Sequence, residues 1–345
     1  MSKLSTLDRF LPVWIGLAMV SGLLLGRLIP GLNDTLDAIK IGTVSLPIAV
    51  GLLAMMYPVL AKVRYGRIGD ELTDHRTLGL SLLMNWLVGP LLMFTLAWTF
   101  LGDLPELRTG LIIVGLARCI AMVLIWNDLA CGSRELAAGL VAINSIFQIV
   151  MYSVLGWFYL SVLPGWLGLD TADLHVAIWD IAKSVLVFLG VPLVAGYLTR
   201  RILEPRRGTN WYEDRFIPRI GPVALYGLLF TIVVLFALQG EQITSHPIDV
   251  VRVAVPLLIY FAVMWTVSFA VAYRMQVPYE RNAAVAFTAA GNNFELAIAV
   301  AIGVFGVTSG QALAGTIGPL IEVPALLVLV YVSLWAKRRY YPDLT

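Results

Sequence analysis

TGLIIVGLARCIAMVLIW (109–126) and AVAFTAAGNNFELAIAVAI (284–302) are two apolar segments, and each carries polar residues near its middle. Cys119 lies in the first segment, and Glu295 lies in the second, 176 residues later. Apolar segments that are interrupted at corresponding positions in two halves of a chain indicate the binding site of a secondary transporter. The two segments therefore predict a membrane fold and also the place where its function resides.

The composition of the whole chain is that of a membrane protein. Of its 345 residues, 59% are hydrophobic and 13% are charged, whereas a soluble domain has about 25% charged residues. The two cysteines, Cys119 and Cys131, give no disulfide framework. The three histidines lie near predicted helix ends, which argues against a histidine-based metal centre within the membrane.

Long apolar runs predict an all-α polytopic membrane protein with no soluble domain, because a run of 18 or more apolar residues is typical of a transmembrane helix. The longest predicted connection, about 200–218, has fewer than 20 residues. The ten predicted spans are 10–29, 41–61, 77–101, 109–130, 136–162, 176–199, 219–239, 250–273, 283–305 and 311–336.

The placement of lysine and arginine sets the orientation of these spans. With both termini cytoplasmic, 18 of the 24 basic residues fall at cytoplasmic ends or connections, as the positive-inside rule requires. Arg27 and Pro30 end the first apolar run without a small-residue cleavage site, so we expect a retained helix and no signal peptide. The predicted location is the plasma membrane, which in bacteria is the inner membrane.

Internal repetition divides the chain into two five-helix halves, residues 1–170 and 171–345. The offset of 176 that relates Cys119 to Glu295 also superposes GSRELAAGL (132–140) on TSGQALAGT (308–316). Five is an odd number of spans, so the second half must be inverted relative to the first. Glycines at matching places predict that spans four and nine are broken and cross near the midplane; ordinary kinking is the alternative.

Cys119 is the first candidate for the substrate site. A thiolate is a soft ligand that selects thiophilic partners, and a neighbouring cation such as Arg118 favours the reactive thiolate. The alternative is a small apolar filler, which is the common role of a lone membrane cysteine. Arg118 either activates Cys119 or points to a different face, as adjacent helical residues do, and pairs with an acid.

Glu295 is the second candidate, because a charge at the bilayer centre costs at least about 2.5 kcal/mol and marks a functional residue by default. Asn292 and Asn293 precede it and offer amide groups to a substrate cavity; capping a half-helix is the alternative. Glu322, between two prolines of the last span, is a second intramembrane acid and a candidate for proton coupling. For both acids the alternative role is structural ion pairing, with Arg118 as the expected partner of Glu295.

Other polar residues are weaker candidates. Asn144 and Gln148 lie one turn apart on span five, where interhelical hydrogen bonding competes with a place in the cavity. Cys131 is expected outside the binding site. The basic connection 200–219 reflects topology and not nucleic-acid binding. No P-loop pattern indicates ATP as the energy source, and no histidine accompanies Cys119 as a base, so we expect neither an enzyme nor a cofactor.

Four motifs resemble the arsenite efflux permeases of arsenical resistance, which belong to the bile acid/sodium symporter superfamily. They are LARCIAMVLIWNDLA (116–130), TAAGNNFELAIAVAI (288–302), GPLIEVPALLVLVYV (318–332) and SLPIAVGLLAMMYPVLAKVRY (45–65). The resemblance extends over nearly the whole chain. It implies ten spans, extrusion of arsenite and often antimonite, and a requirement for the span-four cysteine and the span-nine glutamate, which match Cys119 and Glu295.

The residue chemistry agrees with that expectation. Arsenite at neutral pH is a small, mostly neutral trihydroxy acid with a thiophilic centre, so a single thiol such as Cys119 is a transient arsenic(III) ligand that exchanges with one hydroxyl and releases it again. Three thiols would chelate and trap the metalloid. We expect Glu295 to bind and release a proton as the cavity alternates between faces, which couples arsenite exit to proton influx.

The competing hypothesis is a sodium-coupled importer of an organic anion, the other main activity of the superfamily. A bulky anion requires a cationic or hydrogen-bonding cavity and does not require Cys119. A membrane-embedded receptor is a further alternative, and it would need neither broken helices nor paired sites. Sodium dependence, tolerance of Cys119→Ser, or absence of vectorial flux would distinguish these hypotheses.

Overall fold

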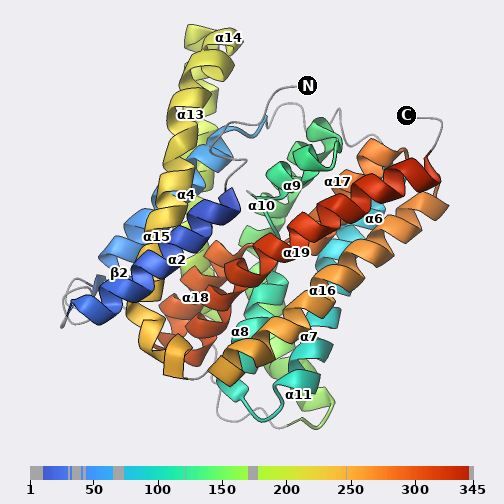
Figure 1. Cartoon of the computed structure of the whole chain (residues 1–345). Coiled ribbons are helices and arrows are strands. Elements are labelled where there is room, and N and C mark those ends of the chain that lie inside the picture. The colour runs from blue at the N-terminus through green and yellow to red at the C-terminus, as the bar shows by residue number, and fades with distance from the viewer. Residues whose placement is uncertain are drawn as a thin grey trace.

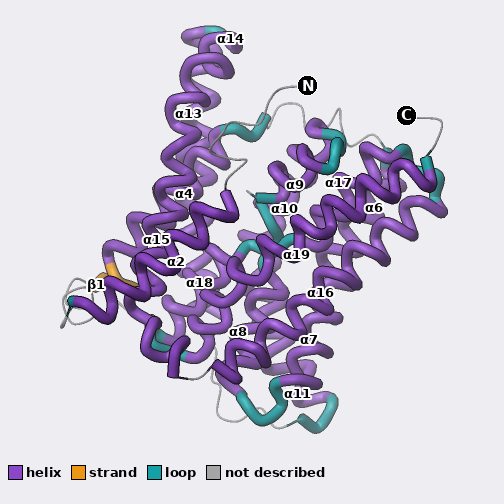
Figure 2. Tube along the Cα trace, in the orientation of Figure 1, coloured by secondary structure: helices purple, strands orange, loops and turns teal. Residues whose placement is uncertain are grey.

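Helices make up nearly all of the structure, a computed structural model that describes residues 11–29, 32, 40–41, 44–64, 74–120, 122–169, 178–245 and 247–341 (Figure 1). The N-terminal ten residues, the connection 65–73 and the boundary between the predicted halves at 170/171 lie outside the described residues. A hairpin of two-residue strands, β1 (Lys40–Ile41) and β2 (Val44–Ser45), precedes the second span. Figure 2 shows this hairpin and the loops between the helices.

Among the described residues, six helices are long and apolar enough to cross a membrane, and shorter apolar helices accompany them. The chain is therefore a multi-pass membrane protein. The first half contains α2 (Leu11–Leu28), α4 (Leu46–Ala61), α6 (His75–Leu83), α7 (Gly89–Phe100), α8 (Pro105–Leu116), α9 (Val123–Leu129), α10 (Arg134–Trp157) and α11 (Leu163–Trp166). The second half contains α12 (Ile178–Val185), α13 (Val191–Arg207), α14 (Thr209–Trp211), α15 (Ile217–Ser245), α16 (Pro247–Arg274), α17 (Tyr279–Ala290), α18 (Phe294–Phe305) and α19 (Gly310–Tyr340).

Four π-helical turns join some of these helices into longer rods. They are η2 (Met84–Val88), η3 (Phe158–Val162), η4 (Leu186–Gly190) and η5 (Tyr212–Phe216). Each turn is followed two residues later by a proline: Pro90, Pro164, Pro192 and Pro218. Proline cannot donate to the carbonyl four residues earlier. In every case that carbonyl is in the middle residue of the π turn, where the wider hydrogen-bond register takes up the disruption.

The predicted connection 200–218 is wrong as a loop. Helix α13 continues to Arg207, and Gly208, with a φ of 88°, separates it from the short helix α14. Arg200 contacts Glu204 at 2.9 Å and also pairs with Glu213. Ion pairing within this arginine-rich stretch lets it stay helical beyond the apolar run, which hydropathy alone does not reveal.

The helices form two groups (Figure 1). In the first group, α15 packs along α2 and α4, and α4 packs along α13. Close approach depends on glycine: a Cβ atom on Gly26 of α2 would lie 2.4 Å from the carbonyl oxygen of Ala237 in α15. In the second group, α16 packs on α17 and α19, α19 packs on α8 and α18, and α7 packs on α8. The candidate site residues all lie in this second group.

Candidate substrate site at the crossing of two broken helices

Spans four and nine are both broken, as predicted. Helix α8 ends at Leu116 and α9 begins at Val123, whereas α17 ends at Ala290 and α18 begins at Phe294. The two interruptions meet in an antiparallel bridge between Arg118 and Asn292. Two backbone hydrogen bonds close the bridge: the amide of Cys119 donates to the carbonyl of Gly291 at 3.3 Å, and Asn293 donates to Ala117 at 3.0 Å. Each break thus supplies partners for the other's backbone, which lipid would not do.

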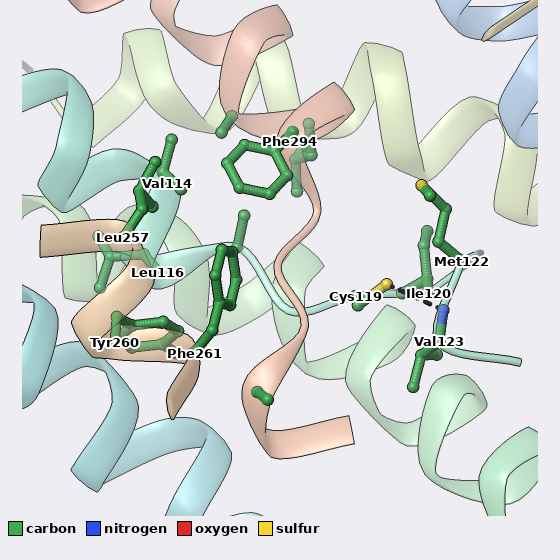
Figure 3. Close-up of a cluster of buried hydrophobic side chains, with 14 of the residues drawn as sticks. Val114, Leu116, Cys119, Ile120, Met122, Val123, Leu257, Tyr260, Phe261 and Phe294 are labelled. Carbon is green, nitrogen blue, oxygen red and sulfur yellow. Dashed lines mark hydrogen bonds between the residues drawn. The ribbon is translucent and has the colours of Figure 1, made fainter. Parts of the chain in front are cut away.

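Cys119 lies on the interruption of span four and is 2% exposed. Its Sγ accepts a hydrogen bond from the amide of Val123, the first residue of α9, at 3.3 Å. Figure 3 shows the thiol beside Ile120, Met122 and Val123. A Cβ atom on Gly291 would lie 3.0 Å from the Cβ of Cys119. The thiol therefore points toward the crossing and sits at the N-terminal end of a half-helix, where backbone amides favour negative charge on sulfur.

Arg118 is fully buried, and its guanidinium points away from the thiol's partners. One Nη donates to the hydroxyl of Tyr260 at 2.7 Å, and the other donates to the carbonyl of Gly115. In the part of the chain that the structure describes, Arg118 takes part in no ion pair within 4.0 Å. The predicted pairing with Glu295 is absent from this conformation, and pairing in another state of the molecule stays a prediction.

Glu295 lies in the first turn of α18, where the helix dipole favours a carboxylate. Asn293 begins this half-helix, and its Oδ1 accepts from the amide of Leu296 at 3.1 Å. The capping role that the sequence left open for Asn293 is therefore present. Its Nδ2 is buried with no hydrogen-bond partner, so one end of the amide is used structurally and the other end remains available to a substrate.

Glu322 also belongs to the crossing. From α19, its Oε1 accepts from the backbone amide of Asn292 at 3.3 Å. It is 1% exposed, and it interacts electrostatically with Glu295. Two acids that the sequence separates by 27 residues thus act on one site.

Asn292 has the clearest unused binding capacity in this region. Its side chain is 1% exposed, and neither Oδ1 nor Nδ2 has a hydrogen-bond partner. A buried amide without partners carries a free-energy cost that a bound hydroxylated molecule would remove. Cys119, Asn292 and Asn293 therefore combine a soft ligand with donors and an acceptor for hydroxyl groups.

The residues expected outside the site are placed as follows. Cys131 is exposed in the turn between α9 and α10, with a φ of 58°. Asn144 accepts from the indole of Trp86 at 3.2 Å, which is the interhelical bonding considered for it. Among the described residues, no group of three or more histidine, cysteine, aspartate or glutamate side chains is arranged to hold a metal ion.

The equivalence of Cys119 with Glu295 is wrong at the crossing itself. The bridge relates Arg118 to Asn292, an offset of 174, and the same offset exchanges the two hydrogen bonds that flank it. Cys119 therefore corresponds to Asn293. The offset of 176 holds later, where Ser133 and Ser309 cap α10 and α19 in the same way. The interruptions and the half-helices that follow them differ in length, so no single offset fits both places.

Comparison with known proteins agrees with this architecture. Residues 49–246 match the Sodium Bile acid symporter family. The chain is 58% identical over 342 residues to the arsenical-resistance protein Acr3 of Corynebacterium glutamicum, covering 99% of this chain and 92% of that protein. It is 30% identical to Acr3 of Alkaliphilus metalliredigens, with 97% and 94% covered, and 35% identical to an uncharacterised transporter of Synechocystis, with 97% and 91% covered. The chain therefore belongs to the Sodium Bile acid symporter family and, within it, to the Acr3 arsenical-resistance permeases.

Proposed function

We propose that this transporter extrudes trivalent arsenic, as arsenite and possibly antimonite, from the cytoplasm in exchange for protons. The observation that carries the proposal is the position of Cys119 at a helix crossing, beside two buried asparagines with unused amide atoms. A thiophilic centre that bears hydroxyl groups matches this combination of ligands. The names of the Acr3 relatives support the same cargo.

The binding step is an exchange at arsenic. The sulfur of Cys119 forms one bond to arsenic, one arsenic–oxygen bond breaks, and the departing hydroxyl leaves as water with the thiol proton. Asn292 and Asn293 then hydrogen-bond the two remaining hydroxyl groups. Cys131, the other cysteine of the chain, is exposed in the α9–α10 turn, so arsenic is held by one sulfur and is released by the reverse exchange.

Proton coupling is assigned to Glu295, with Glu322 as the second acid of the same site. Two carboxylates that share a buried site repel each other when both are ionised, so one of them favours its protonated form. A proton taken up from outside and released inside would reset the site after each arsenite leaves. Arg118 neutralises part of this negative charge when the site rearranges, and the Tyr260 hydroxyl holds its guanidinium in the present conformation.

Alternating access around the crossing follows from two inverted five-helix repeats, residues 1–170 and 171–345, with ten spans and both termini cytoplasmic. The antiparallel direction of the Arg118–Asn292 bridge supports the inversion, because one interruption runs opposite to the other. The distribution of basic residues supports the orientation in the plasma membrane.

Uptake of arsenite into everted membrane vesicles tests the proposal. We expect uptake that requires an inwardly acidic proton gradient, that is abolished by a protonophore, and that is unchanged when potassium replaces sodium. Sodium-dependent transport of an organic anion without arsenite uptake would establish the competing importer, and a protein that binds arsenite without flux would not be a transporter at all.

A further inference from the structure

Gln148 of α10 makes a contact with the crossing that the transport chemistry above does not use. Its Oε1 accepts from the backbone amide of Arg118 at 2.9 Å, and the side chain is fully buried. Its Nε2 donates to the carbonyl of Asn144, one turn earlier in the same helix, at 3.2 Å. This second bond orients the amide group so that its oxygen faces the interruption of span four.

The amide of Arg118 depends on this acceptor. In a continuous helix it would donate to the carbonyl of Val114, but the amide of Ala117 already occupies that carbonyl at 3.1 Å. The break therefore leaves the Arg118 amide without a helical partner, immediately before Cys119. Buried backbone amides are almost always paired, and here a side chain from another span supplies the acceptor.

Glu322 makes the matching contact in the other half of the chain. Gln148 follows Arg118 by 30 residues, and Glu322 follows Asn292 by 30 residues. The offset of 174 that relates the two bridge residues therefore also relates their side-chain acceptors. Each interruption is held at the same backbone position by the last full-length helix of its own half, once by an amide oxygen and once by a carboxyl oxygen.

We propose that Gln148 is a positioning residue for Cys119. It acts through the Arg118 backbone and fixes the interruption of span four so that the thiol faces the crossing. The inference rests on the proposed function for its effect on arsenite, but not for its effect on the thiol itself. The acceptor oxygen is the element that matters, so glutamate in this position keeps the function and leucine removes it.

The test uses the full-length protein with Cys131→Ser, which leaves Cys119 as the sole thiol. The first measurement is the rate at which N-ethylmaleimide alkylates Cys119 in the purified protein. We expect Gln148→Leu to raise this rate at least fivefold, because the segment that holds the buried thiol is released, and Gln148→Glu to stay within twofold of the parent. Should Gln148→Leu not accumulate, Gln148→Met carries the same expectation with a side chain of similar length.

Gln239→Leu is the matched control. Gln239 is also fully buried, but it lies on α15 and donates to the carbonyl of Val307 at 2.8 Å, with no contact to either interruption. Its loss should leave the alkylation rate unchanged. A Gln148→Leu rate within twofold of the parent, or an equal rise in Gln239→Leu, would overturn the positioning role.

Arsenite kinetics in everted vesicles give the second measurement. We expect Gln148→Leu to raise KM for arsenite at least fivefold at unchanged membrane abundance, and Gln148→Glu to restore it. A role that is only structural would lower abundance and maximal rate and leave KM in place, which counts against the proposal. If the parent shows no arsenite uptake while the alkylation rates change as expected, the proposed function fails and the positioning of Cys119 stands.

Discussion

Individual residues at the crossing have divided roles. Cys119 has its sulfur near the amide of Val123, whereas Asn292 has two buried polar atoms without protein partners. Glu322 is already committed to the backbone of Asn292. Among the acids of the site, this leaves Glu295 with the greater freedom to exchange protons, so the first two predictions concern Cys119 and Glu295.

Cys119→Ser keeps the size of the side chain and offers a hydroxyl, but it loses the affinity of sulfur for arsenic. We expect arsenic resistance of cells that carry this variant to fall to that of cells without the transporter, while the amount of protein in the membrane is retained. Resistance assays with quantified membrane fractions measure both. Cys131→Ser is the control and should keep full resistance; a normal phenotype for Cys119→Ser would contradict the assignment.

Glu295→Gln keeps the shape of the side chain and removes its titration. We expect this variant to bind arsenite but to lose uphill transport driven by a proton gradient, measured as arsenite-driven proton movement in vesicles. Glu295→Asp should keep partial function, because it shortens the reach by only one methylene. If the glutamine variant is abundant and still pumps arsenite with unchanged pH dependence, Glu322 becomes the coupling residue.

Elements are shaped here by their interruptions. The four π turns answer prolines two residues further along, whereas the breaks in spans four and nine answer no proline and are held by each other's backbone. Glycine in these breaks matters for space more than for backbone freedom. Gly291 has a φ of −72°, which any residue adopts, yet its Cβ position faces Cys119.

Gly291→Ala should therefore disturb the site by overpacking, which typically costs about 1–3 kcal/mol. The added methyl would lie 3.0 Å from the Cβ of Cys119 and 3.5 Å from its Sγ, so we expect a KM for arsenite at least fivefold higher. Gly79→Ala on α6 is the control, because nothing lies within 4 Å of its Cβ position. Equal kinetics for the two variants would show that the crossing has room to spare.

Helix α6 begins with a capping aspartate outside the membrane-spanning part. Asp74 accepts from the amides of Arg76 and Thr77, both at 3.2 Å, and from the Thr77 hydroxyl at 2.5 Å. The Thr77 hydroxyl lowers the pKa of Asp74 against the opposing effect of burial; the Thr77 amide and the Arg281 guanidinium lower the pKa further. A lowered folded-state pKa means that ionised Asp74 stabilises the fold.

Asp74→Ala should consequently reduce stability by about 1 kcal/mol, the usual worth of an N-cap. The difference from the parent should be complete above the ordinary aspartate pKa of about 3.9 and should vanish as pH falls through the lower folded-state pKa. Thermal unfolding in detergent at pH 7 and at pH 3 measures this. Asp74→Asn keeps a capping oxygen and should lose less at pH 7; an alanine effect that is independent of pH would contradict the account.

The whole molecule places its two cysteines differently with respect to the membrane. Cys119 is buried at the crossing, whereas Cys131 is exposed in the α9–α10 turn, on the side where the basic residues predict cytoplasm. Thr308 is exposed in the turn between α18 and α19, on the predicted outer side. The two turns follow equivalent half-helices of the proposed inverted repeats, so they should face opposite compartments.

A membrane-impermeant maleimide should label Cys131 in everted vesicles and not in intact cells. In a Cys131→Ser background, Thr308→Cys should give the opposite result, because a five-span repeat returns the equivalent turn to the other face. Labelling is read by mass shift of the purified protein. Labelling of both sites from the same side would refute the inversion of the two halves.

Much of this protein was determined by sequence alone. Apolar runs define most of the helices to within a few residues, because hydrophobic length is a local property that the bilayer selects. The polar residues of the breaks, Cys119 among them, stand out for the same reason. The one large error in element limits, at 200–218, arose because the arginine-rich stretch reads as a connection by hydropathy, whereas its ion pairs, one of them to Glu213 beyond α13, keep it helical.

Only the tertiary structure decided how these residues combine. The bridge joins Arg118 to Asn292 across 174 residues, and the acceptors Gln148 and Glu322 reach it from separate helices. The same contacts reassigned the counterpart of Cys119 from Glu295 to Asn293. Sequence periodicity reports which side of a helix is apolar, whereas a hydrogen bond between distant segments depends on where the chain brings both atoms, and that is fixed by packing of the whole fold.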